Sequence, residues 1–279
     1  MIIKNQLKTA VLLAVLTALL LWIGGLFGKT GFYFALVFVG IMNFGSYWFS
    51  HKIVLWMYKA KEAKESEYPK LYKVVKEISR LSGLPMPKVY VIPSEQSNAF
   101  ATGRNPNHAA VAATEGIIKI LAEEELKGVI AHEFAHIKNR DILISTVAGT
   151  IAGVISYIGN MFMWSAMFGD DDNRGNIFGL LLLAIVTPIV ASIIQLAISR
   201  SREYLADETG ARFVKNGNHL ADALEKIEKS VAAHPMRMGT QATAHLFISP
   251  PFRHGAFLSL FLTHPRTDER TKRLRSMKF

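Results

Sequence analysis

Four long stretches of the chain contain no charged residue, and they restrict its possible folds more than any other feature. They are residues 9–27, 31–50, 142–168 and 177–198, with lengths of 19, 20, 27 and 22 residues. A helix needs about 20 apolar residues to cross the hydrocarbon core of a bilayer. A mean hydropathy of +0.22 for the whole chain agrees with this pattern. The sequence therefore predicts a membrane protein with four transmembrane helices, arranged as two hairpins.

The positive charges follow these predicted spans. The formal net charge is +10, and lysines or arginines flank the first, second and fourth spans, whereas the loop after the third contains Asp170, Asp171 and Asp172. The positive-inside rule then places both termini and the segments 51–141 and 199–279 in the cytoplasm of a multi-pass protein of the cell membrane. We expect the lipid bilayer to be a partner, and nucleic acid not to be one, because no aromatic-interleaved basic stripe is present. Without cysteine, the chain has no disulfides or thiolate metal ligands.

The spans divide the chain into four parts. These are an N-terminal transmembrane hairpin (1–50), a first cytoplasmic part (51–141), a second transmembrane hairpin (142–198) and a cytoplasmic helical part (199–279). The first cytoplasmic part is predicted to contain helices at 66–84 and from 122 onward, with short strands at 88–92, 98–103 and 109–113 between them. The expected fold class is therefore a mostly α membrane protein with a small cytoplasmic α+β domain.

A His-Glu-x-x-His motif lies near the end of the first cytoplasmic part. On a helix, His132 and His136 lie one turn apart on one face, so both can bind one metal ion. Glu133 is then next to that metal, where it could act as a general base toward a bound water. The motif favours a zinc site, although two surface histidines on an ordinary helix would give the same spacing.

Glu203 is the predicted third zinc ligand, because catalytic zinc usually has three protein ligands and a water. The helix that carries His136 is expected to continue into the third span, and the fourth span returns just before Glu203. An antiparallel hairpin would thus bring both residues to the same depth. Asp207, one turn later, is expected to hold a ligating histidine through its second ring nitrogen. The alternative is a solvated acidic face that pairs with Arg200 or Arg202.

These motifs, in this order, resemble the HtpX-type integral-membrane zinc metallopeptidases, which are related to the CaaX prenyl proteases. The similarity covers nearly the whole chain and includes NAFATG (98–103), HEFAH (132–136), REYLAD (202–207) and Thr-His-Pro (263–265). The resemblance implies a gluzincin-like peptidase domain, one zinc ion bound by His132, His136 and Glu203, and Glu133 as catalytic base. It also implies a role in the turnover of damaged membrane proteins under stress.

Further site residues are predicted on either side of the motif. An exposed edge strand beside the zinc could pair with a substrate backbone, so the predicted substrate-binding residues are Asn98, Ala99, Phe100 and Ala101. An interior strand is the alternative. His264 resembles the C-terminal histidine of the family and is expected to donate a hydrogen bond to the oxyanion. Arg270 could brace an acidic residue of the site.

The sequence thus predicts a zinc-dependent, membrane-anchored endopeptidase that cleaves membrane or misfolded proteins at the cytoplasmic face of the membrane. One alternative is a prenyl-CaaX-type processing protease, whose lipid-binding chamber would be expected to need more than four membrane helices. The other is a non-catalytic membrane zinc-binding protein. Such a protein could be a sensor or a transporter. A transporter would favour ionisable residues within its spans, and the four runs contain no charged residue.

Overall fold

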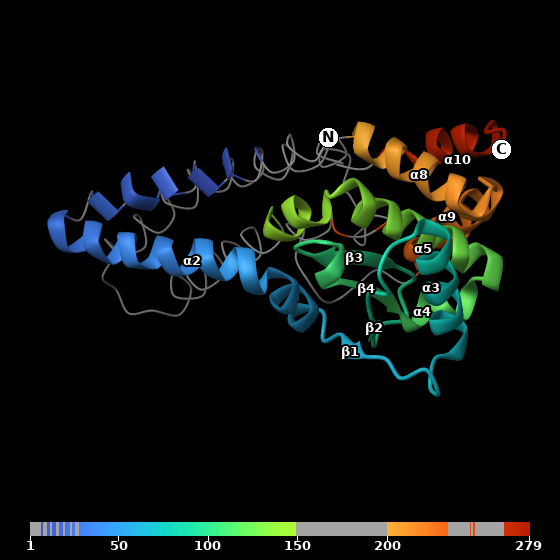
Figure 1. Ribbon diagram of the computed structural model, residues 1–279, viewed down its shortest axis with the longest axis horizontal. Coiled ribbons are helices and arrows are strands. Elements are labelled where there is room, and N and C mark those ends of the chain that lie inside the picture. The colour runs from blue at the N-terminus through green and yellow to red at the C-terminus, as the bar shows by residue number, and fades with distance from the viewer. Residues whose placement is uncertain are drawn as a thin grey trace.

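The computed structural model describes residues 28–148, 200–233 and 265–279, with Leu246, Ile248 and individual residues between 7 and 25. A long helix, α2 (Gly28–Met57), extends away from a unit that contains most of the described residues after it (Figure 1). The strands of this unit are β1 (Lys61–Glu62), β2 (Lys88–Ile92), β3 (Ala99–Gly103) and β4 (Ala109–Thr114). Its helices are α3 (Pro69–Ser82), the 3₁₀ turn η1 (Pro106–His108), α4 (Glu115–Ile120), α5 (Glu123–Asn139), α8 (Arg200–Val214), α9 (Asn218–Ala233) and α10 (Thr267–Arg275). The predicted combination of mostly helical structure and a small sheet is confirmed.

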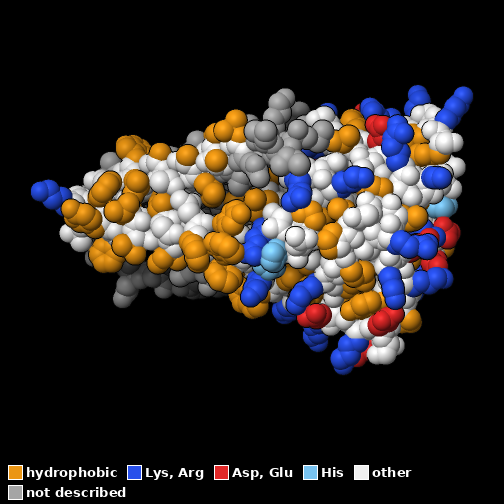
Figure 2. All heavy atoms as spheres, in the orientation of Figure 1, with side chains coloured by type: hydrophobic (Ala, Val, Ile, Leu, Met, Phe, Trp, Pro, Cys, Tyr) orange, Lys and Arg blue, Asp and Glu red, His pale blue; other side chains and the backbone are white. Residues whose placement is uncertain are grey.

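Helix α2 has the apolar surface of a membrane span. It contains the second predicted span and is, within the described part of the chain, the one helix long and apolar enough to cross a bilayer. Hydrophobic side chains cover this elongated part of the molecule, whereas charged side chains gather on the other part (Figure 2). The exposed side chains of α2 include Phe32, Tyr33, Phe34, Leu36, Val37, Phe38, Ile41, Phe44, Tyr47, Trp48 and Phe49. Its 30 residues extend about 45 Å, so α2 can cross a core of about 30 Å and continue beyond it.

The described residues before α2 lie against it in antiparallel order. The Asn43 side chain donates a hydrogen bond of 2.9 Å to the Thr17 hydroxyl, and Gly24 lies against Gly31 and Ala35. Such contacts are those expected of the predicted N-terminal hairpin. Of the third predicted span, only residues 142–148 are described, and they are helical. The fourth span lies outside the described residues.

The sheet has the strand order β1-β2-β4-β3, so β3 is an edge strand. β4 pairs with β2 in parallel and with β3 antiparallel. The Thr114 N–H donates to the Asn98 carbonyl at 2.9 Å, and backbone groups alternate in direction along an antiparallel pair. The backbone N–H and C=O groups of Ala99 and Ala101 therefore point away from β4, toward the open edge.

Both faces of the sheet are covered, and alternate residues of β3 contribute to different cores. Ala99 and Ala101 pack into the larger core with the buried residues of α3 and α5. Phe100 packs on the opposite face, where Val54 and Tyr58 at the end of the α2 segment also lie. The Tyr58 and Phe100 rings are 5.9 Å apart. The membrane-type helix is thus joined directly to the strand that borders the site described below.

Two predicted helix boundaries differ from the structure. Helix α3 begins at Pro69 rather than residue 66, because proline is favoured in the first turn, and it ends before Gly83, whose φ is 71°. The expectation that α5 continues into the third span is wrong. Arg140 has a left-handed φ of 59° and ends α5 at Asn139, and a new helical segment starts at residue 142.

Candidate metal centre

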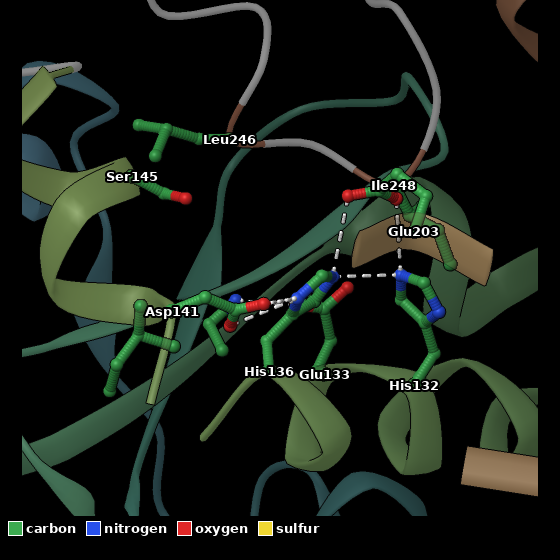
Figure 3. A pocket seen from close by; sticks show the side chains of 10 residues that line it. His132, Glu133, His136, Asp141, Ser145, Glu203, Leu246 and Ile248 are labelled. Carbon is green, nitrogen blue, oxygen red and sulfur yellow. Dashed lines mark hydrogen bonds and ion pairs between the residues drawn. The ribbon is translucent and has the colours of Figure 1, made fainter. Parts of the chain in front are cut away.

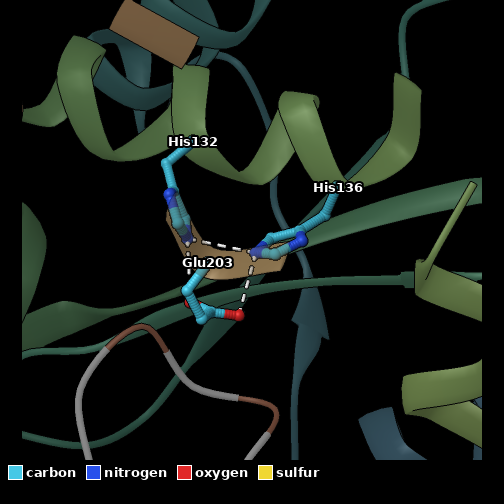
Figure 4. Close-up of side chains that lie close together, drawn as sticks. All are labelled: His132, His136 and Glu203. Carbon is cyan, nitrogen blue, oxygen red and sulfur yellow. Dashed lines mark hydrogen bonds and ion pairs between the residues drawn. The ribbon is translucent and has the colours of Figure 1, made fainter. Parts of the chain in front are cut away.

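Helices α5 and α8 approach each other closely at the predicted metal site. The first turn of α5 contains Glu123, Glu124 and Glu125, whose negative charges stabilise the N-terminal end of a helix. Helix α8 crosses α5 at Gly210, where an added Cβ would lie only 2.8 Å from the backbone nitrogen of His132. This close approach brings Glu203, in the first turn of α8, opposite the two histidines (Figure 4).

The three predicted zinc ligands face one another. The Nε2 atoms of His132 and His136 are 3.1 Å apart, and each lies 3.7 Å from an oxygen of Glu203. Zinc binds nitrogen and oxygen at about 2.0–2.2 Å in a tetrahedron, which requires ligand atoms about 3.3–3.5 Å apart. The observed separations of 3.1 and 3.7 Å lie just below and just above this range. The side chains therefore fit a zinc ion.

His132 is held by a buried chain of charges. Its Nδ1 lies 2.9 Å from Oδ1 of Asp207, and the Arg270 guanidinium donates to both oxygens of the same carboxylate at 2.7 and 2.9 Å. Burial by itself would raise the pKa of Asp207, but the charge of Arg270 and the bond to His132 lower that pKa to about 2. Asp207 therefore stays ionised and orients the imidazole so that Nε2 faces the metal position.

His136 is held by a different carboxylate. Its Nδ1 lies 3.2 Å from both oxygens of Asp141, the second residue after the end of α5. Burial lowers the pKa of His136, but the charges of Asp141 and Glu203 outweigh burial and raise that pKa to about 10 in the absence of a cation. Metal ligands must be deprotonated, so the same negative charges that attract a proton here would attract a zinc ion.

Glu133 lies between the histidines and the edge of the sheet. Its side chain is buried, and Oε2 accepts a hydrogen bond of 2.7 Å from the backbone N–H of Ala101 in β3. Burial and the nearby charge of Glu203 raise the pKa of Glu133 to about 8, against the opposing effect of His136. A carboxyl group with a pKa near neutrality can exchange protons during a reaction.

A small, partly open cavity adjoins these side chains. Its walls include Ala101, Ile142, Leu246 and Ile248 in addition to the charged residues (Figure 3).

The structure brings most of the predicted site residues together, but not all of them. His132, Glu133, His136 and Glu203 line the cavity with Ala101. The other members of the 98–101 stretch do not line the cavity, since the Phe100 side chain packs toward Tyr58 and the Asn98 side chain accepts from the Ala99 N–H at 3.1 Å. His264 lies outside the described residues.

The position of Asp141 was not predicted from the sequence. The only available signal was an acidic residue directly before an apolar run, and its significance depends on the break in the helix at Arg140. Arg270 was predicted to brace an acidic residue, and the structure identifies Asp207 as that residue.

A helix with His-Glu-x-x-His and a glutamate from a second helix define the class of zinc metallopeptidases with a His-His-Glu site. The Peptidase family M48 model matches residues 65–278. The chain is 51% identical over 280 residues to a protease HtpX homolog of Syntrophobacter fumaroxidans, covering 98% of this chain and 99% of the relative. The corresponding homolog of Syntrophotalea carbinolica is 52% identical over 278 residues, covering 98% and 99%.

Similarity extends to an archaeal relative and to a solved structure. The protease HtpX homolog of Thermococcus kodakarensis is 51% identical over 276 residues, covering 97% of this chain and 95% of the relative. A crystal structure of S. mikatae Ste24p matches in fold with a TM-score of 0.52 at 18% identity, covering 98% of this chain and 66% of that one. The chain therefore belongs to peptidase family M48, in which it is an HtpX-type membrane protease with a zinc site of His132, His136 and Glu203.

Proposed function

We propose that this protease cleaves extended segments of membrane or misfolded proteins at the cytoplasmic surface of the membrane, with Glu133 as the general base. The observation that carries the proposal is the position of the Glu133 carboxylate. It is buried between the zinc ligands and the outer edge of β3, where a backbone N–H already binds one of its oxygens.

The proposed chemistry divides between the metal and the side chains around it. Zinc held by His132, His136 and Glu203 supplies a Lewis acid and lowers the pKa of bound water. Glu133 takes a proton from the attacking water and later returns it to the leaving amine. Burial and the negative charge of Glu203 raise the pKa of Glu133, which makes its carboxylate a stronger base toward the proton of the water. His264 remains the proposed donor to the oxyanion.

The substrate is proposed to bind as an added strand. Ala99 and Ala101 direct backbone donors and acceptors toward the open edge of the sheet, which can hold an extended peptide in register without requiring a particular side chain. In this mode the Phe100 side chain supports β3 and does not contact the substrate, since its ring packs toward the end of the α2 segment. This mode of binding favours unfolded chains, whose backbone groups are available for pairing.

The proposed location follows from charge and from the attachment of α2 to the sheet. Positive residues flank the predicted spans, which favours cytoplasmic placement of the parts 51–141 and 199–279 and of the site that they share. Residues 1–50 and 142–198 are proposed to be the two membrane hairpins. The packing of Val54, Leu55 and Tyr58 against the sheet supports a site near the membrane surface, where it would receive chains that emerge there.

The test compares wild-type protein and Glu133→Gln, each purified in full length in detergent, with labelled casein as an unfolded substrate. We expect the variant to keep stoichiometric zinc and to lose about 10²–10⁴-fold in cleavage rate, the usual contribution of a general base. Glu133→Gln protein that cleaves at the wild-type rate would refute the assignment. Comparison of a prenylated with an unprenylated peptide tests the CaaX-type alternative, for which the prenyl group should be required.

A further inference from the structure

The open edge of β3 is partly occupied by the chain's own backbone. The Ile248 N–H donates a hydrogen bond of 3.2 Å to the carbonyl of Ala99, one of the groups that point away from β4. Two positions along, the outward N–H of Ala101 is bound by Glu133. An extended substrate pairing with β3 would need these same outward groups.

Ile248 is also held from its other side. Its carbonyl accepts a hydrogen bond of 3.1 Å from Nη1 of Arg270, the same guanidinium that binds Asp207 behind the zinc ligand His132. The Ile248 side chain is only 2% exposed and belongs to the same core as Ala99. The contact between Ile248 and the strand is therefore a buried one, held on both sides by hydrogen bonds.

Within the described part of the chain, a small cavity lies beside the zinc ligands while this contact is present. Leu246 and Ile248 form part of the wall of this cavity (Figure 3). A paired strand lies about 4.7–4.9 Å from its neighbour, so a substrate strand and Ile248 cannot both occupy the edge at Ala99.

We propose that Ile248 is a built-in competitor for the substrate position on β3, so that the protease is closed in cis and opens only when an extended chain displaces Ile248. The inference rests on the proposed binding of substrate to β3. Among the described residues, one backbone hydrogen bond joins Ile248 to the strand, whereas an extended peptide can form several. A folded protein has its backbone groups already paired and cannot make this exchange. The competitor thus selects unfolded segments and spares folded proteins.

A reversible disulfide tests whether Ile248 must move. The chain contains no cysteine, so Ala99→Cys combined with Ile248→Cys introduces the only two thiols. Residues joined by a strand-type hydrogen bond have Cα atoms about 5 Å apart, within the range that a disulfide requires. The full-length double variant is oxidised, the disulfide is verified by mass spectrometry, and cleavage of labelled casein is measured before and after reduction.

We expect cleavage by the oxidised double variant to be at least tenfold slower than by the same protein after reduction, with equal zinc content in both states. The single variants should show no dependence on reductant. Equal cleavage in the oxidised and reduced states would overturn the proposal, because Ile248 would then be a permanent wall of the site. If the proposed function itself were wrong, the result would be different. The wild-type protein and the reduced variant would then also leave casein intact.

A second variant covers the case in which the disulfide does not form. Ile248→Pro lacks the N–H donor, whereas Ile248→Val keeps it and changes the side chain by one methylene. Loss of one backbone hydrogen bond should raise kcat/KM for casein by about two- to tenfold in Ile248→Pro relative to Ile248→Val. A kcat/KM in Ile248→Pro equal to or below that of Ile248→Val would count against the competitor.

Discussion

Replacement of Gly210 by alanine should separate the two halves of the zinc site. An added Cβ at this position would lie 2.8 Å from the backbone nitrogen of His132 and 2.9 Å from the carbonyl carbon and oxygen of Ala131. These are backbone atoms of a buried helix, and they cannot rotate away as a side chain can. Restoring an ordinary contact of at least 3.4 Å requires α8 and α5 to move apart by about 0.6 Å.

Two effects of this substitution have opposite signs. Alanine in place of glycine within a helix stabilises by about 1 kcal/mol through helix propensity, whereas overpacking costs about 1–3 kcal/mol. The net loss in free energy of unfolding should therefore be about 0–2 kcal/mol. The site should suffer more, because Glu203 moves with α8, and a shift of about 0.6 Å exceeds the tolerance of about 0.2 Å in zinc–ligand distances. With misplacement by 1 Å costing about 10²-fold, we expect kcat/KM to fall about ten- to a hundredfold.

The assay measures casein cleavage, zinc per chain and thermal unfolding of purified Gly210→Ala. Thr209→Ala is the matched control, because it alters the neighbouring position of α8 without adding an atom toward α5, and it should cleave like the wild type. A Gly210→Ala protein with normal zinc content, normal activity and a raised Tm would refute the reasoning. Helix propensity would then dominate, and the close crossing at Gly210 would not be what positions Glu203.

Two further substitutions test the ligands and their support. Glu203→Ala leaves two protein ligands, so the purified protein should lack stoichiometric zinc by atomic absorption and should not cleave casein; retention of a full zinc ion would contradict the ligand set. Asp207→Asn removes the charge that orients His132 and leaves Arg270 buried without its carboxylate. Zinc affinity in chelator competition should fall about 10–100-fold, and the free energy of unfolding should fall by up to about 3–5 kcal/mol. If neither quantity changes, the Asp207–Arg270 pair does not support the site.

Local features of the fold were predictable wherever neighbouring residues alone decide the conformation. The strands expected at 98–103 and 109–113 agree closely with β3 and β4. A helix was expected from residue 122 onward, and α5 begins at Glu123. The end of α5 was not predictable, because nothing in the local pattern requires Arg140 to adopt a left-handed conformation. That break brings Asp141 within 3.2 Å of His136, an interaction that depends on the fold around it.

The zinc-binding pair and its general position near a membrane helix follow from the chain alone, since helical periodicity places residues four apart on one face and uninterrupted apolar runs have few alternatives to a membrane. The third ligand, Glu203, could be predicted only through a hypothesis about how the second predicted membrane hairpin folds back. Three contacts could not be predicted from the sequence. They are the pairing of Asp207 with His132, the pairing of Arg270 with Asp207, and the contact of Ile248 with the outer edge of β3. Each of these contacts joins segments that are far apart in sequence, so none of them follows from a local preference of the residues involved.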